Sequence, residues 1–320
     1  MHTAPPSSSS DVFSAPAPAP DVRALVLGGG GSTGNAWLIG VLAGLAEGGA
    51  DVSAPELTIG TSAGATAAAQ LIGRSPAELY QAVLETPPMH GTAAPSASSA
   101  PRSPATPPGP AGAASALARI TGIITDSADL PDFRRRIGAD ALARGEQAGP
   151  QHSRRWRGIV AARLSTAEWP QRRVVLTAVD ARTGEEVLLD RDSGVDLVDA
   201  VAASCASGPA YRLGGRRLID GGFRIGAENA DLASGCGRVL VLSPLGGRSL
   251  HPRTWGTLLE DRVGTLCAQG SQVRVLVPDV AHDHLFGANA MNAALRPEAA
   301  RVGRDQGLLN APQVAELWRC

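Results

Sequence analysis

The sequence contains no lysine, since all 29 of its basic residues are arginine. This absence excludes Schiff-base chemistry and a phosphate-binding loop that depends on lysine. Aromatic residues make up only 3% of the chain, so the core must be built from Ala, Val, Leu and Ile. The four cysteines lie far apart and form no C-x-x-C pair, which speaks against a zinc site, an iron-sulfur cluster and a disulfide scaffold.

Long apolar runs and an excess of charge are missing as well. No stretch reaches the roughly 18 apolar residues that a membrane-spanning helix needs. Residues 1–20 lack the basic and apolar regions of a signal peptide, so we expect a cytoplasmic protein. The net charge is −1, which gives no long-range field to gather nucleic acid, and a dedicated nucleic-acid binder is disfavoured.

The 320 residues suffice for one large domain. Residues 1–21 carry a serine run and an Ala-Pro repeat, and we expect them to form a disordered tail. Residues 86–116 consist mostly of Pro, Ala, Ser, Gly and Thr with little to bury, which is typical of a mobile insertion or lid. The rest of residues 22–320 is predicted to be the folded domain, and its oligomeric state stays open.

A strand, a glycine-rich turn and a helix occur twice near the start of this domain. Residues 22–27 form the first predicted strand and run into Gly28 to Gly31, and residues 57–59 form the second and run into Gly60. Further strands are expected at residues 173–179, 186–189, 217–219, 238–242 and 273–277. Because helices separate most of them, the pattern predicts a mainly parallel sheet covered on both faces.

The pattern G-x-S-x-G occurs twice, at residues 30–34 and 60–64. It describes a tight strand-to-helix turn that presents a serine hydroxyl to a substrate. Ser62 directly follows a hydrophobic strand and precedes small residues, so it is the better candidate nucleophile. The run Gly28 to Gly31 suits backbone N–H groups that converge on an anion, although close packing alone would also explain such a turn.

Residues 29–34 also fit the dinucleotide pattern G-x-G-x-x-G. A nicotinamide site would need an acidic residue at the end of the second strand. Asp51 precedes that strand, and the strand itself ends in Gly60-Thr61-Ser62. This mismatch disfavours nicotinamide binding.

Asp220, in Asp220-Gly221-Gly222, is the candidate base. An isolated Asp-Gly after a short strand is usually a turn. Beside a nucleophile elbow, however, an aspartate at a strand end can accept the proton of the serine. His282 or His284 is the rival base, because either would complete the chain order Ser, Asp, His of an α/β-hydrolase triad. His-x-His is also a metal-binding pattern, but no further Cys or acid cluster completes a metal site.

Taken together and in this order, the three motifs resemble those of the patatin-like phospholipase family. Residues 203–209 look like its Ala-Ser-x-x-x-Pro segment, and residues 178–184 resemble its central hairpin. The resemblance extends from about Arg23 to Leu242 and implies an α/β fold of three layers, α/β/α, around a mainly parallel sheet. The chain departs from the family at Thr33, where the family usually has Arg or Lys.

The resemblance implies a serine acyl hydrolase that cleaves carboxylic esters, with lipid or phospholipid acyl chains as the expected substrates. It assigns Ser62 as nucleophile and Asp220 as base, and it implies no metal and no organic cofactor. The implied oxyanion hole consists of Gly29, Gly30, Gly31 and Ala63, and the remaining motif glycines are Gly34, Gly60, Gly64, Gly221 and Gly222. Two alternatives stay open, namely a Ser-Asp-His esterase and a non-catalytic lipid-binding scaffold of the same fold.

Arg154-Arg155-Trp156-Arg157 begins a predicted amphipathic helix with Ile159, Val160 and Leu164 on its apolar side. Such a helix either exposes its basic side to solvent, which we favour, or lies on a membrane surface with Trp156 at the interface. The second interpretation would add peripheral membrane contact to a lipid substrate.

Overall fold

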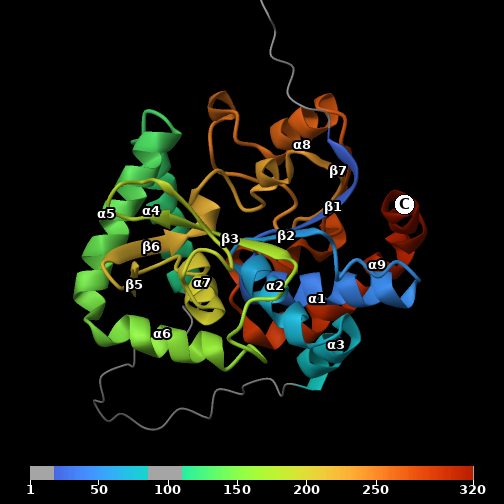
Figure 1. Cartoon of the computed structure of the whole chain (residues 1–320). Helices are drawn as coiled ribbons and strands as arrows, with labels where there is room; N and C mark the ends of the chain where they lie inside the picture. Colours follow the sequence, from blue (N-terminus) through green and yellow to red (C-terminus); the bar gives the residue numbers. More distant parts are fainter. Residues whose placement is uncertain (1–17, 86–109, 320) are drawn as a thin grey trace, which may run out of the picture.

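The computed structural model describes residues 18–85 and 110–319, and a single eight-stranded sheet runs through its centre (Figure 1). The strand order is β5-β6-β3-β2-β1-β7-β8, with β4 paired to β3. The strands are β1 (Ala19–Leu27), β2 (Leu57–Gly60), β3 (Arg173–Asp180), β4 (Glu186–Leu189), β5 (Tyr211–Leu213), β6 (Arg216–Asp220), β7 (Cys236–Leu242) and β8 (Gln272–Leu276).

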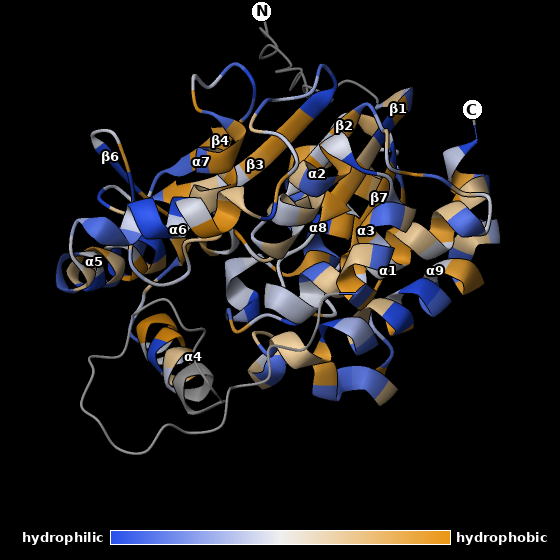
Figure 2. Cartoon of the chain, turned by 90° about the horizontal axis from the view of Figure 1, so that it is seen from below, coloured by the Kyte–Doolittle hydropathy of each residue, from blue (hydrophilic) through white to orange (hydrophobic). Residues whose placement is uncertain are grey.

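The sheet is mainly parallel. Strands β3, β2, β1, β7 and β8 run in one direction, whereas β4 and β6 are antiparallel to β3 and β5 is antiparallel to β6. The central strands are hydrophobic along most of their length, as Figure 2 shows, because both of their faces are covered. Because β1, β2 and β3 are parallel, their carboxyl ends lie at one edge of the sheet, where the two glycine-rich turns begin.

Helices cover both faces, so the three-layer α/β/α fold predicted from the sequence is confirmed. On one face lie α1 (Gly31–Glu47), α2 (Ala63–Gly73), α3 (Pro76–Glu85), α6 (Gln151–Ala161), α7 (Leu197–Ser204) and α9 (Arg296–Trp318). The other face carries α8 (Leu259–Ala268) and η2 (Ala230–Ala233), with α4 (Pro110–Thr125) and α5 (Leu130–Ala148) beside β3 and β6 (Figure 1). Short 3₁₀ turns are η1 (Gly221–Phe223), η3 (Arg253–Trp255), η4 (Val280–Leu285), η5 (Gly287–Asn289) and η6 (Ala293–Leu295).

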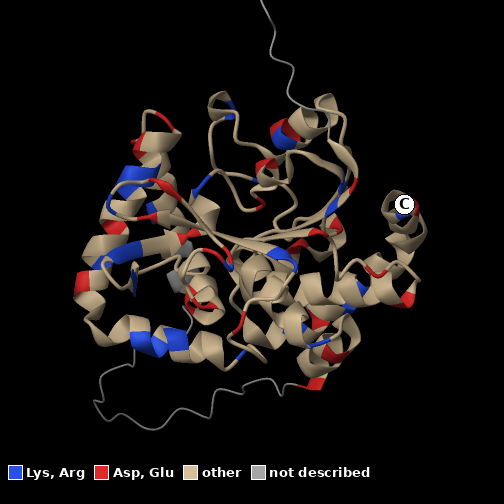
Figure 3. Cartoon of the chain, viewed as in Figure 1, with Lys and Arg blue, Asp and Glu red and all other residues tan. Residues whose placement is uncertain are grey.

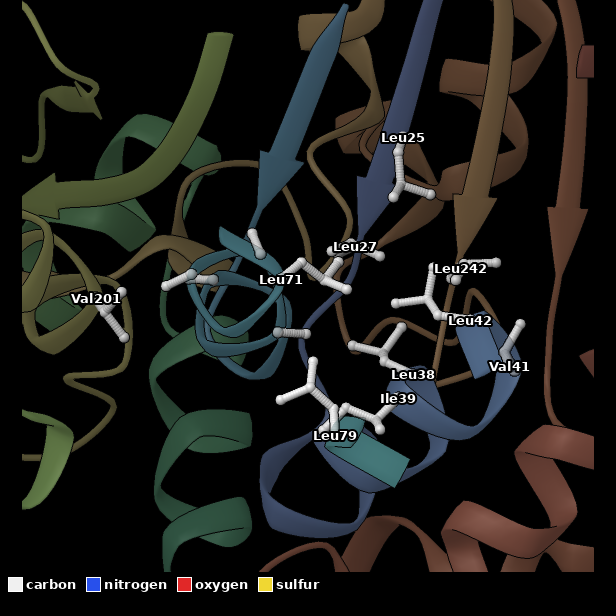
Figure 4. Packing of buried hydrophobic residues seen from close by; sticks show 14 of the residues in the cluster. Leu25, Leu27, Leu38, Ile39, Val41, Leu42, Leu71, Leu79, Val201 and Leu242 are labelled. Carbon is white, nitrogen blue, oxygen red and sulfur yellow. The ribbon is translucent and has the colours of Figure 1, made fainter. Parts of the chain in front are cut away.

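Alternate residues of β1 face opposite sides of the sheet. Leu25 and Leu27 pack on the α1 side, and Ala24 and Val26 pack on the α8 side. Figure 4 shows the first of these clusters, in which aliphatic side chains of β1, β7, α1, α2 and α3 meet. The core is mainly aliphatic, as the scarcity of aromatic residues predicts, and Trp37 is its largest fully buried side chain.

Helices α1 and α9 pack with their backbones almost in contact. A Cβ atom at Gly303 would overlap the carbonyl oxygen of Trp37, and one at Gly40 would overlap the carbonyl oxygen of Ala300. One turn further along the two helices, a Cβ atom at Gly44 or at Gly307 would likewise overlap a backbone carbonyl oxygen of the facing helix. Glycine is therefore required here by close approach, and the two helices form a rigid pair.

Two boundaries differ from the sequence-based expectation. Strand β1 begins at Ala19, whose N–H donates to the carbonyl of Gly235 at 3.0 Å, so residues 19–21 belong to the sheet and not to a tail. Helix α4 begins at Pro110, so residues 110–116 are helical and not part of a loose insertion, since proline is tolerated in a first helical turn and alanine favours helix. The remainder of both segments, residues 1–17 and 86–109, lies outside the described residues.

Helix α6 turns its tryptophan inward. Trp156 packs against the core, and its indole Nε1 donates to the carbonyl of Ala202 at 2.9 Å. Arg157 on the same helix pairs with Asp196 at 2.7 Å and with Asp199 at 3.0 Å. Arginine gathers on α5, α6 and β6 (Figure 3), but Trp156 is not available as a membrane anchor, which favours the solvated amphipathic helix. None of the helices in residues 18–85 and 110–319 is long and apolar enough to cross a bilayer.

Candidate active site

Ser62 occupies the turn between β2 and α2. Its backbone has φ 53° and ψ −111°, and Asn229 is the other non-glycine residue with positive φ in the described part of the chain. Glycine is needed two residues later, because a Cβ at Gly64 would overlap the carbonyl oxygen of Leu27 on β1. A serine held in this strained conformation at the start of a helix has the geometry of a nucleophile elbow.

Asp220 lies at the end of β6, at the same level of the sheet as Ser62. Gly60 pairs with Leu176, and Ala178, two residues further along β3, pairs with Asp220. The Ser62 hydroxyl lies close enough to the Asp220 carboxylate to lower its pKa, and the Gly222 N–H donates to Asp220 Oδ1 at 2.8 Å. The structure therefore brings together the two residues that the motifs single out.

The Asp220 carboxyl group is buried, with 5% of the residue exposed. Burial raises its pKa to about 6, against the opposing effect of the hydrogen bonds from Gly222 and Ser62. A carboxylate with this pKa is ionised at neutral pH and accepts a proton more readily than an ordinary aspartate. It is suited to work as a general base.

The glycine-rich turn after β1 lies against the elbow. A Cβ at Gly29 would stand 3.6 Å from Cβ of Ser62. However, the Gly29 N–H donates to the carbonyl of Ala227 at 2.9 Å, so this amide is not free to bind an oxyanion, contrary to the sequence-based expectation. The N–H groups of Gly30, Gly31 and Ala63 have no hydrogen-bond partner among the described residues.

These three free amides stand at the start of two helices, α1 and α2. A helix N-terminus has unpaired N–H groups and a partial positive charge, which favour an anion. The two starts are adjacent, because a Cβ at Gly34 would lie 3.9 Å from Cβ of Ala63. Gly31 has φ 67°, and a side chain there would meet the carbonyl oxygen of Ala290 at 2.8 Å.

Asn229, which the sequence analysis did not identify, holds the ends of three strands together. Its side-chain Nδ2 donates to Thr61 Oγ1 at 2.9 Å, to Thr177 Oγ1 at 3.2 Å and to the carbonyl of Gly221 at 3.0 Å. Thr61 follows β2, Thr177 lies within β3 and Gly221 follows β6. Asn229 therefore fixes the positions of the segments that carry Ser62 and Asp220. No motif in the sequence points to it.

Ser204 is a second supporting residue. Its Oγ accepts the N–H of Ser62 at 3.0 Å, which fixes the elbow from the end of α7. The next residue, Cys205, donates from its thiol to the carbonyl of Ser62 at 3.1 Å. The segment of residues 203–209 was visible in the sequence, although its Pro209 stands one position later than the pattern Ala-Ser-x-x-x-Pro requires, and the structure places its Ser204 and Cys205 beside the candidate nucleophile.

The histidines that the structure describes form no hydrogen bond with Ser62 or Asp220. His284 Nε2 lies 3.0 Å from Glu298 Oε1 at the surface, and His282 has no hydrogen bond to Ser62 or Asp220. Within residues 18–85 and 110–319, no histidine contacts either residue, so the structure does not favour a Ser-Asp-His triad. No group of three or more His, Cys, Asp or Glu side chains in this part of the chain is placed to hold a metal ion.

Thr33 stands where the resembled family usually carries a basic residue. It is fully buried, and its N–H donates to the carbonyl of Ala290 at 3.0 Å. A cation reaches the turn from elsewhere, since Arg296 Nη1 donates to the carbonyl of Ser32 at 2.7 Å. Arg296 lies 264 positions after Ser32 in the chain, so no local sequence pattern could have revealed this contact.

Comparison with known proteins agrees with the motifs. The family model described as patatin-like phospholipase matches residues 25–231, more than half of the chain. Among solved structures, the type III effector protein ExoU is 14% identical, with 93% of this chain and 54% of ExoU covered at a TM-score of 0.37. VipD from Legionella pneumophila is 11% identical, with 93% of this chain and 67% of VipD covered at a TM-score of 0.41. The chain thus spans about half the length of ExoU.

No curated protein matches the sequence. The family match covers all of the first two helices and the strands that carry Ser62 and Asp220. It includes every motif on which the resemblance was based, and the family is one of hydrolytic enzymes. The chain belongs to the patatin-like phospholipase family, as its motifs predicted.

Proposed function

We propose that this protein is a serine acyl hydrolase that cleaves carboxylic esters of lipids through a Ser62–Asp220 dyad. One observation carries the proposal. Ser62 stands in a strained elbow, and its hydroxyl lies beside the buried Asp220 carboxylate, whose pKa is raised to about 6. A nucleophile and a base in direct contact can perform acyl transfer without a third residue.

In the first half of the reaction, Ser62 Oγ attacks the ester carbonyl carbon while Asp220 takes the hydroxyl proton. Asp220 then gives this proton to the leaving alcohol as the C–O bond breaks, which leaves an acyl group on Ser62. In the second half, Asp220 takes a proton from water as the water attacks the acyl carbon. The carboxylic acid departs, and the proton returns to Ser62.

The negative oxygen formed in both halves needs hydrogen-bond donors. The amides of Gly30, Gly31 and Ala63 support this role, because none of the described residues pairs with them and they stand at two helix starts beside Ser62. Removal of one such donor lowers the rate by about 10²- to 10³-fold in other acyl-transfer enzymes. The Gly29 amide instead anchors the turn to Ala227.

The proposed substrates are lipid or phospholipid acyl esters, as membership of the family suggests. Peripheral contact with a membrane belongs to this proposal for substrates that reside in a bilayer. Such contact would use a surface other than Trp156, which is packed inside.

Labelling with a fluorophosphonate and hydrolysis of p-nitrophenyl esters of increasing chain length test the proposal. Wild-type protein should be labelled at Ser62 and should hydrolyse the esters, whereas Ser62→Ala should do neither. Ser32→Ala is a matched control, because Ser32 lies in the other G-x-S-x-G, at residues 30–34, and this variant should still be labelled.

Two results would contradict the proposal. Folded wild-type protein that is not labelled would favour the lipid-binding scaffold. Full ester hydrolysis by Asp220→Asn, together with its loss in His284→Ala, would replace the dyad by the triad.

A further inference from the structure

Arg296, the first residue of α9, directs its guanidinium into the turn that begins α1. Nη1 donates to the Ser32 carbonyl at 2.7 Å and approaches Ser32 Oγ at 3.2 Å, while Nη2 donates to Asn35 Oδ1 at 3.1 Å. No carboxylate in the described part of the chain pairs with it. Burial, and secondly the charge of Arg163, lowers its pKa to about 10, so it remains a cation at neutral pH.

Asn35 extends this contact from α1 to α2. Its side-chain Nδ2 donates to the carbonyl of Ala63 at 3.4 Å and to Gln70 Oε1 at 3.1 Å. Asn35 is itself buried. A chain of hydrogen bonds therefore runs from α9 through the start of α1 to Ala63, the first residue of α2.

The docking of α9 does not depend on Arg296. The two helices meet at the four glycines described above, and Arg304 of α9 pairs with Glu47 of α1 at 2.6 Å, away from the site. What Arg296 adds is a fixed connection to the turn that carries the free amides. A half-buried cation with no acidic partner is unfavourable unless its hydrogen bonds compensate, and these bonds all end on that turn and on the start of α1.

We infer that Arg296 is a positioning residue for the oxyanion hole. It holds Ser32 and Asn35, and through Asn35 it sets the start of α2 relative to the start of α1. The amides of Gly30 and Gly31 on one helix and of Ala63 on the other thereby keep one mutual geometry. Arg296 lies outside residues 25–231, which the family model matches, so the family match does not assign this role. The inference rests on the proposed hydrolase function.

Hydrolysis of a neutral p-nitrophenyl ester tests this role. Oxyanion donors act in the transition state, so Arg296→Met should lower kcat by about 10- to 100-fold and change KM by less than about threefold. Arg296→Lys keeps the charge but loses the planar fork, and it should recover part of the rate. Asn35→Ala breaks the same chain, so the double variant with Arg296→Met should be no slower than the slower single variant.

Arg304→Met is the matched control, because it removes an arginine that links the same two helices outside the site. It should keep kcat within about twofold of wild type. A loss of kcat in Arg304→Met equal to that in Arg296→Met would show a general effect of helix docking and would overturn the inference. Circular dichroism establishes that each variant is folded, and if Arg296→Met does not fold, Asn35→Ala decides in its place.

Three further results would overturn the inference. The first is a kcat within about twofold of wild type in folded Arg296→Met, or in Asn35→Ala where that variant decides. The second is a loss seen with an anionic phospholipid but not with the neutral ester, which would make Arg296 a headgroup contact. The third is unlabelled, inactive wild-type protein, which would overturn the proposed function as well. Labelled wild type with unaffected variants contradicts only the role of Arg296.

Discussion

Asp220 shows how a single position acquires its chemistry from its surroundings. Its side chain is buried beside Ser62, and the backbone N–H of Gly222 donates a hydrogen bond to it. No cation among the described residues pairs with it, so burial dominates and the pKa rises to about 6. In the proposed mechanism the reactive form is the ionised one, since only the carboxylate can accept the Ser62 proton.

This pKa predicts the pH dependence of the reaction. Because the protonated carboxyl cannot act as base, kcat/KM should fall about tenfold per pH unit below about pH 6 and reach a plateau above it. Initial rates with a neutral ester between pH 4.5 and pH 8 measure this profile. A histidine base could give a similar profile, so His282→Gln/His284→Gln is the control, and it should keep the inflection. A profile that is flat through this range, or one abolished by the histidine replacements, would contradict the assignment to Asp220.

At the residue scale, the sequence predicts positions that short motifs contain. Ser62 and Asp220 were recognisable because the turns around them need glycines at fixed spacing. The amide of Gly29 was misjudged, because its partner, the carbonyl of Ala227, lies in a distant loop. Asn229 and Arg296 were missed for the same reason, since their partners are distant in sequence and only folding brings them together.

The pairing of α1 with α9 is the central feature at the scale of secondary structure. Helix α1 begins at the candidate oxyanion hole, and α9 begins with Arg296, so the distance between the two helices affects the site. Glycines at the crossing let the backbones meet, and any side chain there must push the helices apart.

Gly303→Ala tests the importance of this close packing. The added Cβ would overlap the carbonyl oxygen of Trp37 and lie 3.0 Å from the N of Val41, so we expect a loss of about 1–3 kcal/mol in the free energy of unfolding. Gly264→Ala in α8 is the control, because nothing lies within 4 Å of its Cβ. The control should stabilise the protein by up to about 1 kcal/mol through helix propensity. Urea denaturation measures both, and equal effects of the two variants would show that the crossing tolerates a side chain.

Element boundaries were less predictable than element types. The strands of the parallel sheet were recognisable from short runs of Val, Leu and Ile between turns. The start of β1 at Ala19 was not, because Ala-Pro repeats have no strand signal and the pairing of Ala19 with Cys236 supplies the order. Likewise, Pro110 begins α4 although the composition around it is that of a loop.

At the scale of the whole molecule, the family match ends before the fold does. Strand β7 pairs with β1 at the centre of the sheet, and α9 covers the outer side of α1. Both lie beyond residue 231, the last one matched. The segment around Ala290 also rests on the glycine-rich turn. Residues after the matched region therefore complete both the core and the candidate site, and we expect that the matched region alone does not fold.

A chain that ends at Leu295 and so lacks α9 tests this conclusion. Loss of α9 would expose the face of α1 that α9 now buries, including the backbone around Trp37 and Val41. We expect the shortened chain to lose its cooperative thermal transition and near-ultraviolet circular dichroism, to bind the dye ANS, and to escape fluorophosphonate labelling.

Leu309→Glu is the control within α9. Because Leu309 is 79% exposed, this substitution should not affect any of these measurements. A shortened chain that melts cooperatively near the wild-type temperature would show that the matched region and β7–β8 fold without α9. Labelling of that chain at the wild-type rate would further show that the site needs neither the helix pair nor Arg296.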